Sequence, residues 1–325
     1  MKKMKKLLAL LLITALIVGF TACGNGSPAG NDGTFQIGII QLMEHPALDA
    51  AREGFMAALE SEGISAEFDY QNAQGDAPTL STIAQRFVNN DVDLILAIAT
   101  GSAQAVAAET QEIPIVGTAI TDYEVARLVD SNEAPGGNVT GASDMNPIAE
   151  QIALIQEFMP EIGTLGIVFS SNEPNSVIQA EIAQGVAESL GIEVVVGTVT
   201  NVNDVQQVTT SIANQVDAIY IPTDNTYANA MSLVAQISID TNTPVFGAEP
   251  NMVMGGGIAT LGIDYFDLGF QSGRMAAQIL RGEAEPATMP IQWAENFSYT
   301  VNGYMVEALG ITVPERFLEY IQFSD

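Results

Sequence analysis

Residues 93–107 read DLILAIATGSAQAVA, and this stretch decides the fold. Its apolar run at 94–99 is short and continuous, which is typical of a strand buried on both faces of a parallel sheet. Thr100, Gly101 and Ser102 then form a turn of small residues, and helix-forming residues follow. A buried strand that turns directly into a helix is half of a βαβ unit. In such sheets, ligands bind at the carboxyl ends of the strands.

The same layout recurs in the second half of the chain. Residues 217–230, DAIYIPTDNTYANA, again place a buried strand before a polar turn and a helix. Gly38 and Gly166 take the same place in the first strand of each copy, and Asp76 and Asp204 are separated by the same offset. We therefore expect two copies of one α/β half.

Strands and helices alternate through each copy, which predicts parallel βαβ units with right-handed crossovers. The strands expected in the first copy lie at 35–43, 64–70, 94–99, 113–120 and 138–142. In the second copy, residues 257–262 are expected to repeat the fifth strand. A long helix at 265–282, a late strand at 291–302 and a tail with helices complete the chain.

The predicted fold is α/β, with two Rossmann-like lobes that carry parallel sheets and are joined by a hinge. The 325 residues suffice for about two domains. Lobe 1 is expected to span 35–145, with roughly 265–290 returning to it, and lobe 2 to span 146–264 together with roughly 291–325.

The start of the chain predicts export. Residues 1–22 combine the basic start MKKMKK, an apolar stretch and small residues before Cys23, which is typical of a secretion signal. Cys23 is the only cysteine, so no intramolecular disulfide can form. Its position resembles a bacterial lipobox, in which the cysteine is lipidated, although Phe20 stands where leucine is usual; a plain signal peptide is the alternative. Residues 23–34 are expected to form a flexible tether.

The charge balance excludes nucleic acid as a partner. All four lysines lie in the first six positions, which leaves six arginines against 39 acidic residues, a difference of −33. Such a surface repels nucleic acid and contains no basic patch. The acidic residues are scattered rather than clustered, so neither a metal site nor a cofactor is expected.

The sequence offers little material for catalysis. His45 is the only histidine, which together with the single cysteine excludes Cys–His and multi-His metal sites. The sequence contains neither a GxSxG nucleophile motif nor a GxxxxGK[ST] phosphate loop, and the glycines at 255–257 precede a strand rather than follow one. We therefore expect a binding protein rather than an enzyme.

Polar residues gather at the ends of the expected strands, on the edge where both sheets would bind a ligand. The candidate ligand-binding residues are Glu44, His45, Thr100, Gly101, Ser102, Thr121, Asp122, Asn172, Asn175, Ser176, Asp224, Asn225, Glu249 and Asp264. Taken singly, each also suits a turn or a helix N-cap. As a set they combine hydroxyls and helix N-termini, which suit a carboxylate, with carboxylates that suit an ammonium. An α-amino acid carries both groups.

Several motifs resemble one family. EHPALD, NAQGD, IAQRFV, ATGSAQA, NVTGASD, the ExNS at 173–176, PTDN and GIDYFDLG are similar to those of ABC-transporter substrate-binding proteins of the tryptophan/tyrosine-binding type, from about Phe35 to Pro314. The resemblance implies a type I periplasmic-binding fold, in which hinge bending encloses a ligand, often an aromatic amino acid. It also implies separate permease and ATPase partners, a monomer, and a lipid anchor at the outer face of the cell membrane or a periplasmic location.

The resemblance also suggests roles for individual residues. Thr100, Ser102 and the helix behind them would hold the ligand carboxylate, helped by Asn175 and Ser176, and Asp224 would pair with the ammonium. A tyrosine at 123, 227 or 265 would stack on an aromatic side chain or else pack in a core.

A sensor of the same fold that signals to a membrane partner is an alternative function that the sequence leaves open. The effector domain of a transcription regulator is disfavoured, because the chain has a signal peptide in place of a DNA-binding module. A secreted enzyme is disfavoured by the missing nucleophile and base.

Overall fold

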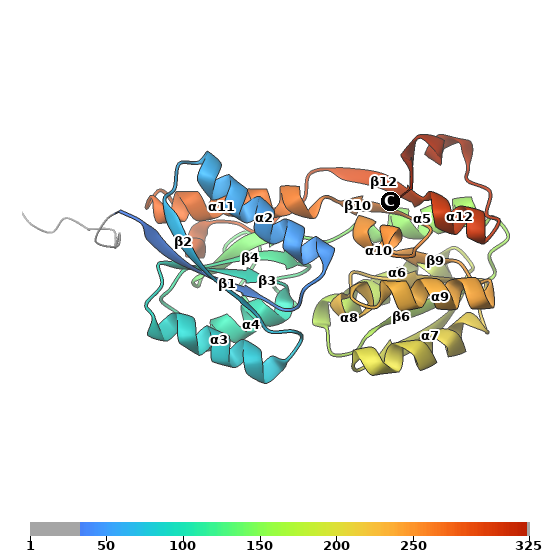
Figure 1. Cartoon of the computed structure of the whole chain (residues 1–325), viewed down its shortest axis with the longest axis horizontal. Helices are drawn as coiled ribbons and strands as arrows, with labels where there is room; N and C mark the ends of the chain where they lie inside the picture. The colour runs from blue at the N-terminus through green and yellow to red at the C-terminus, as the bar shows by residue number, and fades with distance from the viewer. Residues whose placement is uncertain (1–32, 324–325) are drawn as a thin grey trace, which may run out of the picture.

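The computed structural model describes residues 33–323, which form two lobes side by side (Figure 1). The predicted signal peptide, Cys23 and most of the predicted tether lie outside the described residues. The predicted α/β fold with parallel sheets is confirmed.

Lobe 1 contains a six-stranded parallel sheet in the order β11-β5-β4-β3-β1-β2. Every residue of β3 is buried, as expected for a central strand. The strands are β1 (Phe35–Gln41), β2 (Ala66–Asn72), β3 (Leu94–Ile98), β4 (Ile115–Ile120), β5 (Val139–Ser143) and β11 (Gln292–Trp293). The helices are α2 (Pro46–Ser61), α3 (Ala77–Asn89), α4 (Thr100–Glu109), α11 (Tyr265–Leu280) and the short η2 (Pro286–Thr288).

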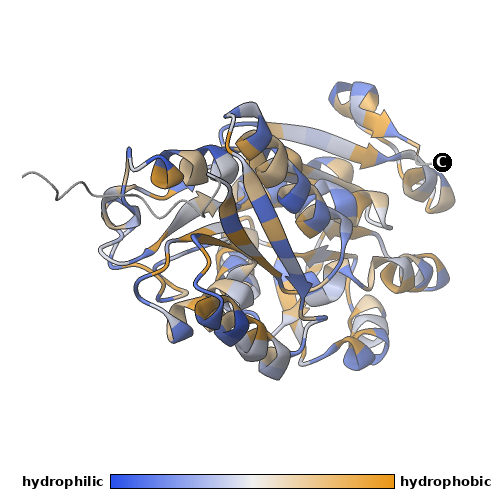
Figure 2. Cartoon of the chain, turned by 60° about the vertical axis from the view of Figure 1, so that its left-hand side comes forward, coloured by the Kyte–Doolittle hydropathy of each residue, from blue (hydrophilic) through white to orange (hydrophobic). Residues whose placement is uncertain are grey.

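Lobe 2 contains a four-stranded parallel sheet in the order β7-β6-β8-β9. Its strands are β6 (Thr164–Ser170), β7 (Glu193–Val199), β8 (Ala218–Ile221) and β9 (Val245–Gly247). The helices of this lobe are α5 (Ile148–Phe158), α6 (Pro174–Ser189), η1 (Val202–Asp204), α7 (Val205–Ala213), α8 (Asn225–Ala228), α9 (Met231–Thr241), α10 (Pro250–Met254), α12 (Gly303–Ala308) and η3 (Glu315–Tyr320). Hydrophilic residues lie along the outer sides of the helices in both lobes (Figure 2).

The internal repeat is visible in the backbone. Gly63 and Gly191 stand at equivalent positions of the two copies, and each follows the C-cap of a long helix, with φ of +70° and +81°. Only glycine adopts this left-handed conformation without strain, so each glycine ends its helix and turns the chain into the next strand.

The repeat breaks down at its last strand. β10 (Ala259–Ile263) joins a separate sheet with β12 (Phe297–Asn302) and β13 (Ile321–Gln322), and it pairs antiparallel with β12. The prediction that residues 257–262 repeat β5 is therefore wrong. The late strand supplies the reason: its second part runs beside β10, while its first part, β11, joins lobe 1. The single strand predicted at 291–302 is thus two strands.

Three segments connect the lobes. They run from β5 to α5, from β10 to α11, and from β11 to β12. The last two carry the chain into lobe 1 and back again, so α11 belongs to lobe 1 although it follows a strand of lobe 2 (Figure 1). The chain therefore passes between the lobes only through short segments. Short segments between two compact bodies are the arrangement of a hinge.

Helices α2 and α11 pack closely along lobe 1 (Figure 1). A Cβ on Gly269 would lie 1.9 Å from the carbonyl oxygen of Ala51, and one on Gly54 would lie 2.0 Å from the carbonyl oxygen of Phe266. Glycine is therefore required at both positions for the backbones to approach this closely.

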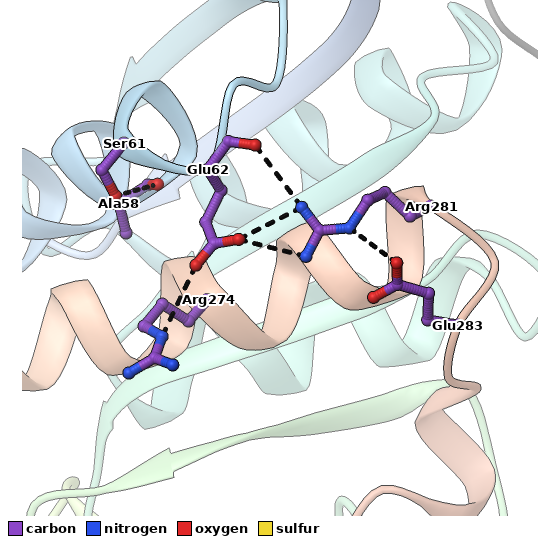
Figure 3. Close-up of polar contacts among 6 residues, drawn as sticks. All are labelled: Ala58, Ser61, Glu62, Arg274, Arg281 and Glu283. Atoms are coloured by element: carbon purple, nitrogen blue, oxygen red, sulfur yellow. Dashed lines mark hydrogen bonds and ion pairs between the residues drawn. The ribbon is translucent and has the colours of Figure 1, made fainter.

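Ion pairs join the same helices at their C-terminal ends. Glu62 Oε2 accepts hydrogen bonds from Nη1 and Nη2 of Arg281, each at 3.1 Å, and Glu62 Oε1 lies 3.6 Å from Nε of Arg274 (Figure 3). The helix pair is thus held along its length. Because α2 begins after His45 and α11 begins at Tyr265, this packing sets the relative positions of those two residues.

Replacing Gly269 by alanine tests this packing. The added methyl group would meet a backbone carbonyl, so α11 must move away from α2, and we expect the free energy of unfolding to fall by about 1–3 kcal/mol in urea titrations. Gly185→Ala is the matched control, because Gly185 is exposed in α6 and no atom lies within 4 Å of the position that a Cβ would take there. That change should stabilise the protein by about 0.5–1 kcal/mol. Unchanged stability in Gly269→Ala would contradict the close approach.

Candidate functional site

The lobes meet around a small, enclosed polar cavity. Its volume is about 10 Å³, close to the smallest that holds one water molecule. Lobe 1 contributes His45, Ala47, Leu48, Ala119 and Tyr265 to the lining, the first connecting segment contributes Asp144, and lobe 2 contributes Asn175, Thr223, Asp224, Asn225, Ala228, Glu249 and Met252. Strand ends of both lobes therefore face one another, as the sequence predicts for a binding site.

Asp144 lies where the chain leaves β5 for lobe 2. Its Oδ1 accepts a hydrogen bond from the Thr121 hydroxyl at 2.8 Å, and its Oδ2 accepts one from the Tyr265 hydroxyl at 3.0 Å. Burial raises the pKa of the Asp144 carboxyl, although both hydrogen bonds oppose that effect.

Asp224 caps α8 from the end of β8. Its carboxylate accepts hydrogen bonds from the backbone N–H groups of Ser170 at 2.6 Å and Tyr227 at 2.8 Å. Burial, followed by repulsion from Glu173, raises the pKa of Asp224 to about 8. This side chain therefore holds two strand ends of lobe 2 in place and also brings a carboxyl group to the cavity.

Glu249 repeats this arrangement after β9. It accepts hydrogen bonds from the backbone N–H groups of Asn251 at 2.7 Å and Met252 at 2.8 Å, and thereby caps α10. Burial raises the pKa of Glu249 to about 7. Like Asp224, Glu249 is positioned by backbone donors, which lower its pKa without overcoming the effect of burial.

Glu173 orients the loop that carries Asn225. Its Oε2 accepts hydrogen bonds from the backbone N–H of Asn225 at 3.0 Å and from Asn225 Nδ2 at 2.6 Å. Its Oε1 accepts from the backbone N–H of Thr226 at 2.9 Å and from the Thr226 hydroxyl at 2.8 Å. The side chain of Asn225 therefore has one defined orientation toward lobe 1.

The cavity is lined by acidic side chains that no lysine or arginine of the described residues balances. Its lining has three carboxyl groups, from Asp144, Asp224 and Glu249, and contains no lysine or arginine among the described residues. Ionised carboxyl groups away from water are unfavourable unless a positive charge joins them. The site is therefore suited to a small cationic group, with a size close to that of a water molecule.

Hydrogen bonds across the lobes close the site. His45 Nε2 lies 3.0 Å from Asn225 Oδ1, and Gln179 Nε2 donates to the Thr121 hydroxyl at 3.2 Å. Asn146, in the first connecting segment, donates through Nδ2 to the hydroxyl of Thr223 at 3.1 Å. The first two bonds join the lobes directly, and the third joins the first connecting segment to lobe 2, so the lobes are in contact around the cavity.

A larger cleft of about 710 Å³ lies beside the cavity and also separates the lobes. Its lining from lobe 1 is Leu42, Met43, Gln74, Gly75, Ala77, Leu80, Ser81, Gly101, Gln104 and Ala105, and from lobe 2 Ser170, Asn172, Glu173, Pro174, Asn175, Thr200, Asn201, Val202, Thr226 and Asn229. Asn175 lines both spaces. A ligand with a cationic end and an apolar body has room for both parts here.

The structure brings many of the sequence-predicted residues to these spaces. His45, Asn175, Asp224, Asn225 and Glu249 line the enclosed cavity. Gly101 and Asn172 line the larger cleft with Asn175. Thr121 reaches the cavity through its hydrogen bond to Asp144. Glu44 is exposed at a third interlobe opening of about 240 Å³, which His45 and Glu249 also line.

Other predicted residues form hydrogen bonds with backbone groups. Ser176 donates its hydroxyl to the carbonyl of Thr223. Asp122 accepts from the backbone N–H groups of the two residues after Tyr123. Asp264 is exposed, caps α11, and lines a pocket outside the interlobe space.

Thr100 and Ser102 form the first turn of α4 rather than a separate turn before it. Both are buried, and neither hydroxyl has a hydrogen-bond partner among the described residues. Ala99, directly before them, has a φ of +78°, which strains a residue with a Cβ. Between them, Gly101 presents the helix N-terminus to the larger cleft.

The three tyrosines take different places. Tyr123 is buried in lobe 1, where its hydroxyl donates to the carbonyl of Ala142, and Tyr227 is buried in lobe 2 beside Thr209. Tyr265 alone of the three lines the cavity, through a hydroxyl that is bonded to Asp144. Of the two predicted roles, stacking on a ligand or packing in a core, Tyr123 and Tyr227 therefore show the packing role.

Asp144 and Thr223 are cavity residues that the candidate set omits. Asp144 directly follows a buried strand, which is the signal that identified Asp224, but it falls in a segment that reads as an ordinary turn. Thr223 shares its loop with Asp224.

Metal clusters and membrane spans are both absent from residues 33–323. No three His, Cys, Asp or Glu side chains in this range gather into a set that could hold a metal ion. None of its helices has the length and hydropathy needed to span a bilayer.

Comparison with known proteins shows extensive similarity. A family model described as ABC transporter substrate binding protein matches residues 36–322. A tyrosine-binding protein of Clostridioides difficile (strain R20291) is 36% identical over 323 residues, which covers 95% of this chain and 93% of that protein.

Solved structures are similar over the same region. An ABC domain from Streptococcus pneumonia in complex with L-Trp superposes with a TM-score of 0.86 at 35% identity, covering 89% of this chain and 99% of that one. The ligand-free, open structure of a substrate-binding protein with adhesive properties from Clostridium difficile gives a TM-score of 0.70 at 39% identity, covering 90% and 99%.

The raised carboxyl pKa values predict how stability depends on pH. Protons held by folded Asp224 and Glu249 are released on unfolding, so their contribution to stability is present at acidic pH and is lost as pH rises through about 7 to 8. His45, whose pKa burial lowers, acts oppositely but only below about pH 6.5. We expect the free energy of unfolding without ligand to fall by roughly 1–2 kcal/mol between about pH 6.5 and about pH 8.5.

Denaturant titrations across this range measure the effect. Few other groups ordinarily titrate there, because the chain has one histidine and one cysteine. Asp224→Asn should flatten the pH profile, whatever its effect on absolute stability. A profile in the unaltered protein that is flat or rises with pH would show that the two carboxyl groups are ionised throughout.

Proposed function

The chain belongs to the family of ABC transporter substrate-binding proteins, and we propose that it captures an amino acid between its lobes, with an aromatic amino acid as the first candidate. It is a solute-binding protein and not an enzyme, as its relatives are. The similar proteins named for tyrosine and solved with L-Trp support the aromatic class.

The observation that carries the proposal is the buried set of three carboxyl groups in a lining that contains no lysine or arginine among the described residues. An α-ammonium group has about the size of the enclosed cavity and supplies the missing positive charge. Asp144, Asp224 and Glu249 line it from the first connecting segment and from two strand ends of lobe 2. A neutral sugar would leave these carboxyl groups without a counter-charge.

The rest of the ligand occupies the larger cleft. Leu42, Leu80 and Val202 supply apolar contacts for a side chain from both lobes. The N-termini of α4 and α6 open on the same cleft through Gly101 and Asn175, and free backbone N–H groups at helix N-termini favour a carboxylate. An amino acid therefore meets groups suited to each of its three parts.

Ligand capture involves closure about the connecting segments. The chain resembles the L-Trp complex more closely than the open, ligand-free structure, even though its sequence identity to the first is lower. This difference supports a closed form that ligand stabilises and an open form that admits it. The bonds from His45 to Asn225 and from Gln179 to Thr121 would form on closing.

Membership of the family supports the cellular role that we propose. The chain delivers its ligand to a separate permease and ATPase as part of an importer. It acts outside the cytoplasm as a monomer, tethered through a lipid on Cys23 and the segment up to residue 34. The signal sequence and the lipobox-like residues support this placement.

Isothermal titration calorimetry with L-tryptophan and L-tyrosine tests the proposal. We expect saturable one-to-one binding of at least one of them, and ligand at a hundredfold excess over Kd should add about 2.7 kcal/mol to the free energy of unfolding. Absence of binding by every amino acid, with binding of a sugar or polyol instead, would contradict the proposal.

Asp144→Asn then tests the basis of recognition. The amide has the shape of the carboxyl group and can still bond to two hydroxyl groups, so the fold should persist. Removing one of the charges that face the ammonium should weaken affinity at least tenfold, about 1.4 kcal/mol or more. Asp240→Asn, the same change on the exposed surface of α9, should leave affinity unaltered. Equal affinities in both variants would remove Asp144 from the site.

A further inference from the structure

The two ring nitrogens of His45 have different surroundings. Nε2 lies 3.0 Å from Asn225 Oδ1 across the lobes, whereas Nδ1 is buried and has no hydrogen-bond partner among the described residues. The side chain is 7% exposed and lines the enclosed cavity. One nitrogen thus joins the lobes, and the other is buried without a partner on a side chain that lines the cavity.

Asn225 determines which nitrogen carries the proton. Its Nδ2 donates to Glu173 Oε2 at 2.6 Å, and the reverse orientation would place the amide oxygen against that carboxylate. Oδ1 therefore faces His45 and can only accept, so Nε2 must be the donor. Burial lowers the pKa of His45, against the opposing effects of the Asn225 bond, Glu173 and Asp49. The neutral ring then presents a bare lone pair at Nδ1.

The cavity lining offers this lone pair few donors. The hydroxyl of Tyr265 donates to Asp144, and the side-chain amides of Asn175 and Asn225 donate to the carbonyl of Thr223 and to Glu173. Each carboxyl oxygen of Asp144, Asp224 and Glu249 accepts a hydrogen bond from another group, and none of these oxygens is bonded to His45. A buried acceptor without a donor is unfavourable, so a ligand that donates a hydrogen bond here is favoured over one that does not.

We propose that His45 is a specificity residue, which uses Nε2–H to hold the lobes closed and Nδ1 to accept a hydrogen bond from the ammonium group of the bound amino acid. This inference rests on the proposed function. The neutral ring of His45 selects ligands that carry an N–H donor, and the carboxyl groups select ligands that carry a positive charge. The cross-lobe bond makes that selection coincide with closure.

Two substitutions separate the roles of the nitrogens. His45→Gln places an amide where Nε2 stands, so it can keep the bond to Asn225 but provides no acceptor at Nδ1. His45→Asn places its amide where Nδ1 stands and is too short to reach Asn225. With L-tryptophan as the titrant in calorimetry, we expect His45→Gln to raise Kd at least tenfold and His45→Asn to raise it less.

The same data can overturn the inference. If His45→Gln binds L-tryptophan as tightly as the unaltered protein, or the two variants lose affinity equally, the residue acts only as a latch or as packing. Thermal unfolding of both variants without ligand identifies any loss of folding. If the unaltered protein binds no amino acid, the proposed function itself fails, and this inference fails with it.

Nitrogen NMR gives a readout that a purely structural role would not produce. His45 is the only histidine, so untagged protein with 15N-histidine yields one pair of ring signals. In the complex with L-tryptophan we expect the proton on Nε2 and an unprotonated Nδ1 displaced upfield, as for an acceptor in a hydrogen bond. A proton on Nδ1, or an Nδ1 signal at the position of an unbonded acceptor, would overturn the assignment.

Discussion

The burial of Asp144, Asp224 and Glu249 between the lobes, with no lysine or arginine in the described lining, is the constraint on which the site depends. Backbone N–H groups and hydroxyls fix where these carboxyl groups lie, but they do not neutralise them. The protein must therefore hold protons on part of the set or take up a cation. Under the proposed function, recognition and closure would be coupled, because the lobes surround this charge only when they meet.

The fold places these carboxyl groups close to the segments that connect the lobes. Asp144 lies in the first connecting segment and Tyr265 begins the helix that follows the second. Helix α11 is packed against α2 through Gly54 and Gly269, so Tyr265 and His45, at the starts of the two helices, move as one body. Opening the lobes would carry His45 away from Asn225 on the opposite lobe. Residues that line the cavity, such as His45 and Asn225, thus also join one lobe to the other.

Much of this was accessible from the sequence, because strand ends and repeats are local patterns. The buried strand at 94–98, the two halves and the positions of Asp224 and Glu249 followed from apolar runs and polar turns. Contacts across the lobes could not be predicted in this way. His45 and Asn225 lie far apart in the chain, and the local pattern around one of them gives no information about the other. The same limit explains the error at β10, whose sequence resembles β5 but whose partner, β12, is set by tertiary packing.

Proton exchange on ligand binding tests the central claim most directly. Calorimetry of L-tryptophan binding near pH 7.5, repeated in buffers of different ionisation enthalpy, gives the number of protons exchanged. Because an ammonium lowers the raised pKa values of Asp224 and Glu249, the account predicts a net release of up to about one proton per ligand. Net uptake, or no exchange at all, would contradict a cationic group bound among buried carboxyl groups.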